Sequence, residues 1–183
     1  MRTVATVDRD ATLRLFLALR LPSDALDRLL AWGGEALSGG RIVPREHLHV
    51  TLAFLGARPA PELATICGAL RDAAAAAGAI ELEPLRWRET RSVGMLVLTD
   101  HGGRAGALAA DLHGRLEELE VYRREMRPWL PHVTVLRFRE RPRLDPTVPA
   151  FGRFAPSDAA AFLSRLHPSG ARYEVLESFA LGG

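Results

Sequence analysis

The stretch HLHVTLAFLG, residues 47–56, has a counterpart in LPHVTVLRF, residues 130–138. Each stretch holds a His, one spacer residue, a Thr and then an apolar run. Chance predicts roughly 0.3 His-x-Thr tripeptides in a chain with six histidines and nine threonines. Two copies in matching surroundings therefore indicate two halves of one site.

Both tripeptides have an aliphatic spacer and an aliphatic residue after the Thr. These aliphatic residues are Val50, Leu52, Val133 and Val135. Successive side chains of a β-strand point to opposite faces, so this pattern buries the aliphatic pair and directs His and Thr together to the other surface. The sequence thus predicts two strands that each present a His and a Thr side by side.

Two such strand faces suit a phosphodiester if they meet across a cleft. The imidazoles of His49 and His132, with an ordinary pKa of about 6.5, could act as general acid and general base near neutral pH. One would activate water while the other protonates the departing oxygen. The hydroxyls of Thr51 and Thr134 would donate hydrogen bonds to the phosphate oxygens. This scheme requires no metal and no cofactor. For either His alone, the competing interpretation is a hydrogen bond within its strand.

A metal site is the rival interpretation of the same residues. His47 and His49 share a strand face, and together with His132 they could ligate a metal, because imidazole is the commonest metal ligand in proteins. Neither motif contains a carboxylate to complete or orient such a site. We therefore favour the metal-free scheme.

Hydrophobic periodicity predicts alternating strands and helices, without a Gly-rich phosphate loop. The predicted strands cover residues 13–21, 48–55, 79–88, 93–99, 131–138 and 172–180. The predicted helices begin after Pro22, after Pro59 and Pro61, near Gly103, and at Ser157. The Pro- and Arg-rich segment 139–149 is expected to form a loop.

Two of these helices carry more specific expectations. Ser23 and Asp24 supply N-cap chemistry to the first helix. Ser157 is expected to cap the last helix. The apolar face of that helix would consist of Ala159, Phe162, Leu163 and Leu166.

Composition limits the class of protein. With 183 residues the chain fits one domain or two small lobes. Cys67 is the only cysteine, which excludes an internal disulfide and a Cys-rich zinc site, and we expect it to be a small buried residue on a helix. No apolar run approaches the length of a membrane span, and Arg14 and Arg20 interrupt the apolar stretch near the start. A soluble cytoplasmic protein is the expectation.

Charge says less about the partner. The net charge of +2 is too small to indicate a strong electrostatic grip on nucleic acid, although a pI of about 9.3 permits an anionic partner. All 24 basic residues are Arg, which suits bidentate phosphate contacts. A GC-rich coding bias explains this usage more simply.

At these residues the sequence resembles the RNA 2',3'-cyclic phosphodiesterase family, also called 2'-5' RNA ligases, of the two-histidine (2H) phosphoesterase superfamily. RLFLALRLP at 14–22 is similar to the family's opening strand, and FLSRLHPSGARYEVLESFAL at 162–181 to its closing helix and strand. IVPREHLHVTLAFLG at 42–56 and RPWLPHVTVLRF at 127–138 are similar to its two motif blocks. The resemblance covers most of the chain.

The resemblance implies a two-lobed α+β fold, in which antiparallel sheets line a central cleft and helices lie on the outer faces. Residues 1–183 would form a single domain made of two pseudo-symmetric lobes, with one His-x-Thr on each inner strand. The implied activity is metal-independent hydrolysis of RNA 2',3'-cyclic phosphate ends to 2'-phosphates, with 2'-5' ligation as the reverse reaction. By this likeness, His49 is the general acid for the departing 3'-oxygen and His132 the base for water, while Thr51 and Thr134 hold the phosphate.

The family also uses an Arg five residues after the second His and a Phe five residues after the first, here Arg137 and Phe54. An odd offset in a regular strand places both side chains on the face opposite His and Thr, unless the strand ends or bulges first. We expect Arg137 to contact phosphate. For Phe54, packing in the core and stacking on a base stay open.

The remaining expectations concern departures and alternatives. Ile42 stands where the family often has an aromatic residue, and Val135 where Leu is more frequent. The histidines that match no catalytic position are interpreted as surface or structural residues: His47, His101, His113 and His167. The expected partner is RNA with a 2',3'-cyclic phosphate end, or a related nucleotide, bound by a monomer that contacts no membrane. The alternatives are an RNA-end or nucleotide binding module without useful turnover, and a 2H phosphoesterase acting on small cyclic nucleotides.

Overall fold

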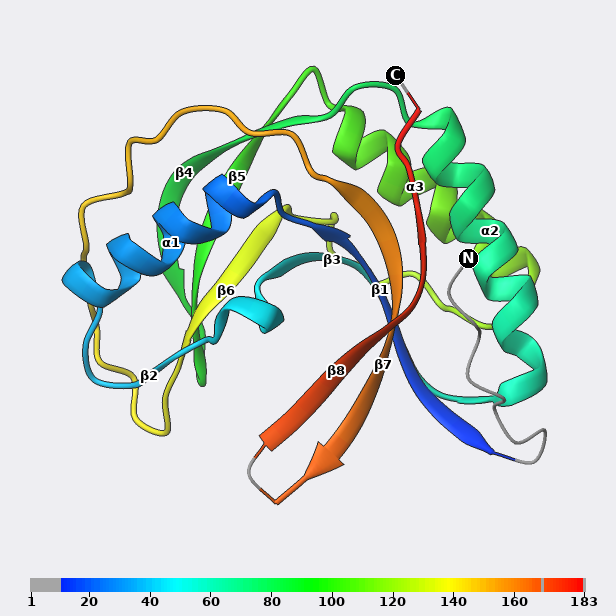
Figure 1. Ribbon diagram of the computed structural model, residues 1–183, viewed down its shortest axis with the longest axis horizontal. Coiled ribbons are helices and arrows are strands. Elements are labelled where there is room, and N and C mark those ends of the chain that lie inside the picture. Colours follow the sequence, from blue (N-terminus) through cyan, green and yellow to red (C-terminus); the bar gives the residue numbers. More distant parts are fainter. Residues whose placement is uncertain (1–10, 169, 183) are drawn as a thin grey trace.

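A single curved antiparallel sheet forms the centre of the computed structural model, which describes residues 11–168 and 170–182 (Figure 1). Its strands are β1 (Thr12–Arg20), β2 (Arg41–Ile42), β3 (His49–Pro59), β4 (Glu81–Glu89), β5 (Val93–His101), β6 (His132–Arg137), β7 (Asp158–His167) and β8 (Gly170–Phe179). Across the sheet they follow the order β4-β5-β6-β3-β1-β7-β8, with β2 beside β6. All of these neighbouring pairs are antiparallel, which confirms the predicted α+β class.

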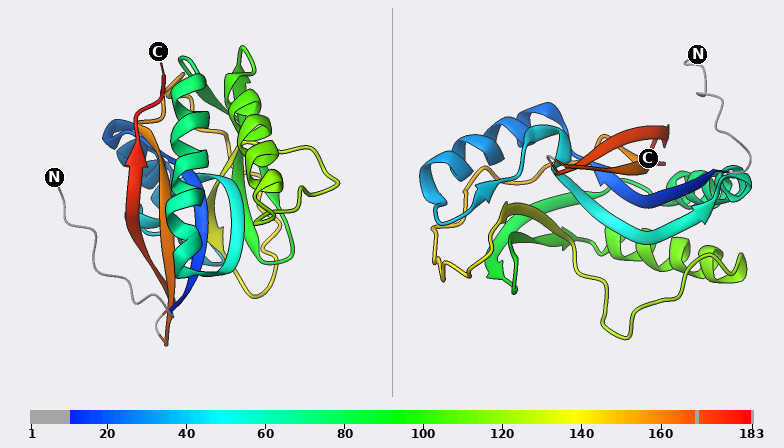
Figure 2. Two further views of the ribbon diagram at one scale, coloured as in Figure 1. Left: turned by 90° about the vertical axis from the view of Figure 1, so that its right-hand side faces the viewer. Right: turned by 90° about the horizontal axis from the view of Figure 1, so that it is seen from below.

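Three α-helices accompany the sheet in the described residues. They are α1 (Ser23–Ala36), α2 (Leu63–Ala76) and α3 (Arg104–Glu118). Helices α2 and α3 lie side by side along one side of the sheet, whereas α1 lies apart from them, near β4 (Figures 1 and 2). There the ring centroids of Trp32 on α1 and Trp87 on β4 are 6.2 Å apart. No helix in this part of the chain is long and apolar enough to cross a membrane.

The two faces of β1 show how the sheet separates core from site. Leu15, Leu17 and Leu19 are fully buried in the main core, which also contains the apolar faces of α2 and α3. Phe16 and Ala18 point the other way, into a small second cluster with residues of β7. Alternation along a strand produces this division. The predicted Cys67 is confirmed as a buried residue of α2, and its burial raises the pKa of the thiol to about 12.

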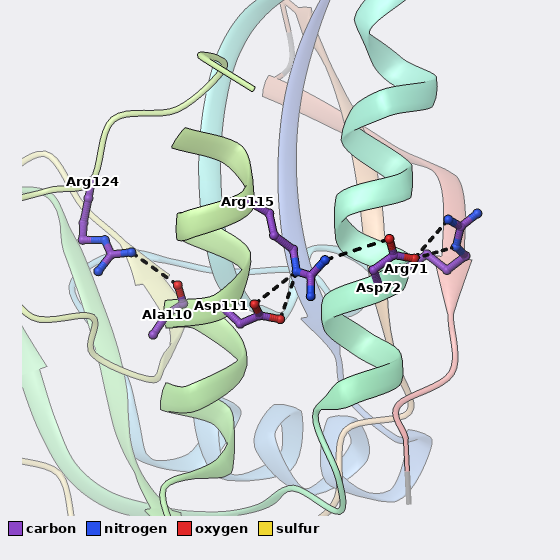
Figure 3. A network of polar contacts seen from close by, with 6 residues as sticks. All are labelled: Arg71, Asp72, Ala110, Asp111, Arg115 and Arg124. Carbon is purple, nitrogen blue, oxygen red and sulfur yellow. Dashed lines mark hydrogen bonds and ion pairs between the residues drawn. The ribbon is translucent and has the colours of Figure 1, made fainter. Parts of the chain in front are cut away.

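Polar side chains connect α2 and α3 at their solvent-facing sides (Figure 3). Arg115 of α3 lies 3.1 Å from Asp111, four residues earlier on the same helix, and 3.9 Å from Asp72 of α2. All three side chains are substantially exposed, so each ion pair adds only about 0.2–1 kcal/mol. The helices are therefore held together mainly by their buried apolar faces.

The sheet narrows to a single joint between β3 and β6. Val50 and Val133 are the one residue pair that links these strands, and both are fully buried. On one side of the joint lie β2, β4, β5 and β6, and on the other lie β1, β3, β7 and β8. The two sheets expected from the family resemblance thus form one continuous sheet that is almost divided at the place where the two His-x-Thr motifs meet.

The predicted helix at Ser157 is wrong, because Asp158–His167 form strand β7 between β1 and β8. The backbone N–H of Ser157 donates to the carbonyl of Arg20 and so extends the strand pairing. Residues 159–164 of β7 are all buried. A strand covered on both faces is apolar at every position, so its sequence lacks the alternation that would separate it from a buried helix.

The predicted N-cap of the first helix is also wrong. Pro22 occupies the N-cap position of α1, and no side chain caps this end of the helix. The Pro22 carbonyl instead accepts the first helical hydrogen bond, from Leu26 at 3.1 Å. The other predicted strands and helices are present with shifted ends, and residues 139–149 lack regular structure as expected.

Candidate active site

A cavity of about 180 Å³ lies beside the joint between β3 and β6. Its lining residues are Phe16, Arg41, Val43, Pro44, His47, His49, Thr51, Phe54, His132, Thr134, Arg137 and Tyr173. The cavity therefore brings together both His-x-Thr motifs, 83 residues apart in sequence. Its wall contains two arginines and three histidines but no Asp or Glu. Such a wall suits an anionic ligand.

The two motif histidines are oriented in the same way. In His49, Nδ1 lies 2.8 Å from the carbonyl oxygen of His47, and in His132, Nδ1 lies 2.8 Å from that of Leu130. A carbonyl oxygen only accepts, so Nδ1 is the protonated nitrogen in both rings. Nε2 is then the nitrogen that takes up or releases a proton in each ring. In His49 this nitrogen lies 3.1 Å from Oγ1 of Thr51.

Electrostatics favour the neutral form of His49. Its pKa is lowered to about 4, mainly by burial; the hydrogen bond to the His47 carbonyl acts in the opposite direction, and the charge of His132 acts in the same direction as burial. Both motif imidazoles line the same cavity. Burial likewise lowers the pKa of His47; the charge of Glu46 opposes this effect, and the charges of Arg137 and Arg41 add to it.

Phe54 and Arg137 reach the cavity because both motif strands bulge at the same position. In the pairing of β3 with β1, Leu52 has no partner, since Thr51 and Ala53 face successive residues of β1. In the pairing of β6 with β5, Val135 is skipped in the same way. Each bulge lies three residues after its His and reverses the side-chain alternation. The odd offset of five therefore returns both side chains to the face of His and Thr.

Phe54 accordingly lies outside the core. Its side chain is 51% exposed, on the cavity wall. The guanidinium carbon of Arg14 lies 5.0 Å from the centre of its ring, within the range of a cation–π contact. The core alternative for Phe54 is thus wrong.

Two side chains stabilise the bulge of β3 through hydrogen bonds to its backbone carbonyl groups. The indole N–H of Trp129 donates to the carbonyl of Thr51 at 2.9 Å, and Nε2 of the buried His113 lies 2.8 Å from the carbonyl of Leu52. On β6 the carbonyl of Val135 is satisfied differently, by the backbone N–H of Val43 at 2.9 Å. Buried carbonyl groups require such partners. His113 is therefore a structural residue, as predicted.

The sequence interpretation missed several cavity residues. His47 was expected to be a surface or structural residue, but it lines the cavity and its ring centroid lies 4.3 Å from that of Tyr173. Tyr173 belongs to β8, and Arg41 to the two-residue strand β2, which had no periodicity to reveal it. His101 lies outside the cavity lining, and its Nε2 is 2.7 Å from Glu83. The one sequence signal for these additional lining residues was the spacing of His47 and His49, which predicts that both lie on one strand face.

The arrangement does not form a metal-binding group. Across the described ranges, no three His, Cys, Asp or Glu side chains come together in a way that could hold a metal ion. Three histidines line the cavity, and the side chains that line it beside them include two arginines, whose positive charges disfavour a cation. The polar groups that remain are suited to an anion.

Comparison with known proteins places this site in a family. The family model described as the 2'-5' RNA ligase superfamily matches residues 21–167. The chain belongs to the 2'-5' RNA ligase superfamily. The matched residues include all of β3 and β6, and therefore both His-x-Thr motifs and Arg137 of this superfamily member. Tyr173 lies beyond the matched region.

Individual relatives of this 2'-5' RNA ligase superfamily chain agree with that assignment. A Thermus thermophilus protein named RNA 2',3'-cyclic phosphodiesterase is 32% identical, with 93% of this chain and 91% of the relative covered. A solved structure, also of a Thermus thermophilus protein, is 31% identical, with 93% and 99% covered and a TM-score of 0.80. LigT from E. coli, solved with 3'-AMP, shares the fold at 21% identity, with 94% and 100% covered and a TM-score of 0.81.

Proposed function

We propose that this protein is a phosphodiesterase that hydrolyses the 2',3'-cyclic phosphate at an RNA end to a 2'-phosphate, without a metal ion. The observation that carries this proposal is the meeting of both His-x-Thr motifs in one cavity whose wall has no acidic residue. The name of the Thermus thermophilus relative supports the same reaction.

The cyclic phosphate would lie between the two threonines. The hydroxyls of Thr51 and Thr134 donate hydrogen bonds to its non-bridging oxygens, and Arg137 adds a charge-assisted contact. These three groups fix the phosphorus between the imidazoles of His49 and His132. Such orientation contributes strongly to catalysis, because the phosphate and the catalytic groups are already held in the reactive geometry.

Nε2 of His132 would take a proton from water as its oxygen attacks the phosphorus. The bond from phosphorus to the 3'-oxygen then breaks, and Nε2–H of His49 gives its proton to that oxygen. The products are a 2'-phosphate and a 3'-hydroxyl. The family name also points to 2'-5' ligation. In that reaction the 5'-hydroxyl of a second RNA end would attack the phosphorus in place of water, and the product would be a 2'-5' linkage.

His49 must be protonated to act as the acid, although burial lowers its pKa to about 4. A bound phosphate supplies negative charge beside this imidazole and raises its pKa. Substrate binding would thus promote protonation of His49.

The decisive experiment is hydrolysis of an oligonucleotide with a 2',3'-cyclic phosphate end by the purified protein in EDTA. We expect turnover to persist, and His49→Ala and His132→Ala each to lower it by about 10²-fold or more. His101→Ala, whose side chain lies outside the cavity lining, is the matched control and should retain full activity. Complete loss of activity in EDTA would contradict the metal-free mechanism. Tight binding without product over hours would instead support a binding module.

The roles of the two histidines can be separated with a phosphodiester that carries a nitrophenyl leaving group. Such a leaving group departs without protonation, so an enzyme that lacks its general acid loses little on this substrate. We expect His49→Ala to be far less impaired on the nitrophenyl ester than on the cyclic phosphate. His132→Ala should be impaired on both. If His132→Ala were instead the less impaired variant on the nitrophenyl ester, His132 would be the acid and His49 the base.

A further inference from the structure

Two arginines face each other on the cavity wall. Arg41 on β2 lies directly opposite Arg137 on β6, and both line the cavity. Residues in such a position on antiparallel strands have Cα atoms about 4.5–5.5 Å apart. Like charges directly opposite each other destabilise a sheet, because they repel. This arrangement therefore indicates a place where bound negative charge offsets the repulsion.

In the part of the chain that the structure describes, neither guanidinium forms an ion pair with a carboxylate. Among the described residues, no ion pair includes Arg41 or Arg137, although many other arginines of the chain are paired. The positive charges of Arg137 and Arg41 both lower the pKa of His47, in addition to the effect of burial. The two guanidiniums thus remain able to bind phosphate oxygens.

Arg41 lies at the end of β6 that is farther from the joint between β3 and β6. Along β6, the distance from the joint at Val133 increases from Thr134 to Arg137, and β2 pairs with β6 only at that far end. The guanidinium of Arg41 extends from there toward the start of β8, where a Cβ atom built on Gly170 would lie 3.7 Å from its nitrogens. Arg41 therefore lines the cavity beside the start of β8.

We propose that Arg41 binds the internucleotide phosphate next to the cyclic end and thereby makes the enzyme prefer an RNA chain to a mononucleotide. This inference rests on the proposed function. A mononucleotide 2',3'-cyclic phosphate has only the reacting phosphate, which Thr51, Thr134 and Arg137 hold. An RNA chain has a second phosphate one nucleotide away, and Arg41 supplies a cation without a carboxylate partner on that side.

The test compares three substrates: a 2',3'-cyclic mononucleotide, a dinucleotide with the same cyclic end, and that dinucleotide with a neutral methylphosphonate between its nucleosides. We expect kcat/KM of the native enzyme to be about tenfold higher for the charged dinucleotide than for the neutral one, as for a charge-assisted hydrogen bond. Arg41→Ala should abolish this ratio, and Arg41→Lys should retain part of it.

Arg153→Ala is the matched control, because Arg153 is an exposed arginine outside the cavity that pairs with Glu81 at 3.2 Å. It should leave the ratio unchanged. An equal loss on all three substrates in Arg41→Ala would overturn the proposal, since Arg41 would then serve the reacting phosphate or the fold. A native enzyme with no preference between the charged and neutral dinucleotides would overturn it as well. Absence of turnover on every substrate would instead refute the proposed function.

Discussion

Burial on the cavity wall keeps the imidazole of His49 neutral, since its pKa falls to about 4. In the unfolded chain the same group titrates at about 6.5. Between these values the unfolded chain binds a proton that the folded protein does not, so the contribution of His49 to the free energy of unfolding is complete above about pH 6.5. It is lost as the pH falls toward 4, by about 3 kcal/mol in total.

This linkage predicts the behaviour of His49→Gln, which cannot titrate. Between pH 7 and 4.5 we expect the native protein to lose about 2–3 kcal/mol more of its unfolding free energy than the variant. Urea unfolding of both proteins at the two pH values measures the difference. Equal losses would show that His49 titrates alike in the folded and unfolded states.

Phe54 offers an exposed ring on the cavity wall, and we expect it to stack on the terminal base. Loss of a stacking ring typically costs about 1–3 kcal/mol per base, which predicts that Phe54→Ala lowers kcat/KM by about tenfold. Leu85 on β4 is a control with similar exposure, 53% against 51%, but outside the cavity. Leu85→Ala should leave kcat/KM unchanged. A cyclic substrate without a base should be turned over equally by the native protein and Phe54→Ala.

At the scale of elements, the bulges decide which residues of β3 and β6 share a face. The His-x-Thr pairs could be predicted from the sequence because the alternation from His49 to Thr51 is local. The position of Phe54 could not, because the extra residue Leu52 is defined by the pairing of β3 with a distant strand. The same holds for Arg137 and the pairing of β6 with β5.

Trp129 is expected to maintain the bulge of β3 through its hydrogen bond to the Thr51 carbonyl. Trp129→Phe removes that donor and keeps a smaller aromatic ring, so we expect a loss of about 1–2 kcal/mol in stability and a lower kcat, as Thr51 and His49 lose their fixed positions. Trp32→Phe is the matched control, because the Trp32 indole donates to the Thr147 carbonyl at 2.8 Å, outside the cavity. It should lower stability without changing kcat at about 25 °C. A similar fall of kcat in both variants would contradict the role of Trp129.

At the scale of the whole molecule, the sequence predicted the fold class and the final strand but not strand β7. Residues 159–164 are buried on both faces, which made strand β7 resemble a helix. Arg41 reaches the cavity because β2 pairs with the end of β6, and Tyr173 reaches it from β8, the edge strand on the other side of β3. Such contacts depend on tertiary packing, which local patterns do not encode.

We expect the chain to unfold as one cooperative unit, in agreement with the predicted single domain. The main core contains residues from both sides of the joint, among them Leu17 on β1 and Leu96 on β5. Urea unfolding followed by circular dichroism and by tryptophan fluorescence should give coincident transitions. Two separate transitions would show that the two sides of the sheet are independently stable.

The matching bulges have a consequence for the direction in which a substrate can lie. Phe54 and Arg137 occupy equivalent places after the two motif histidines. The two motif strands therefore carry different side chains at this one position. An exact twofold site would accept a nucleotide equally well in either of two reversed orientations. Here one side offers an aromatic ring and the other a guanidinium, and a nucleotide has its own apolar base and charged backbone. If the proposed function holds, we expect this difference to select one orientation, and with it which oxygen of the ring phosphate leaves.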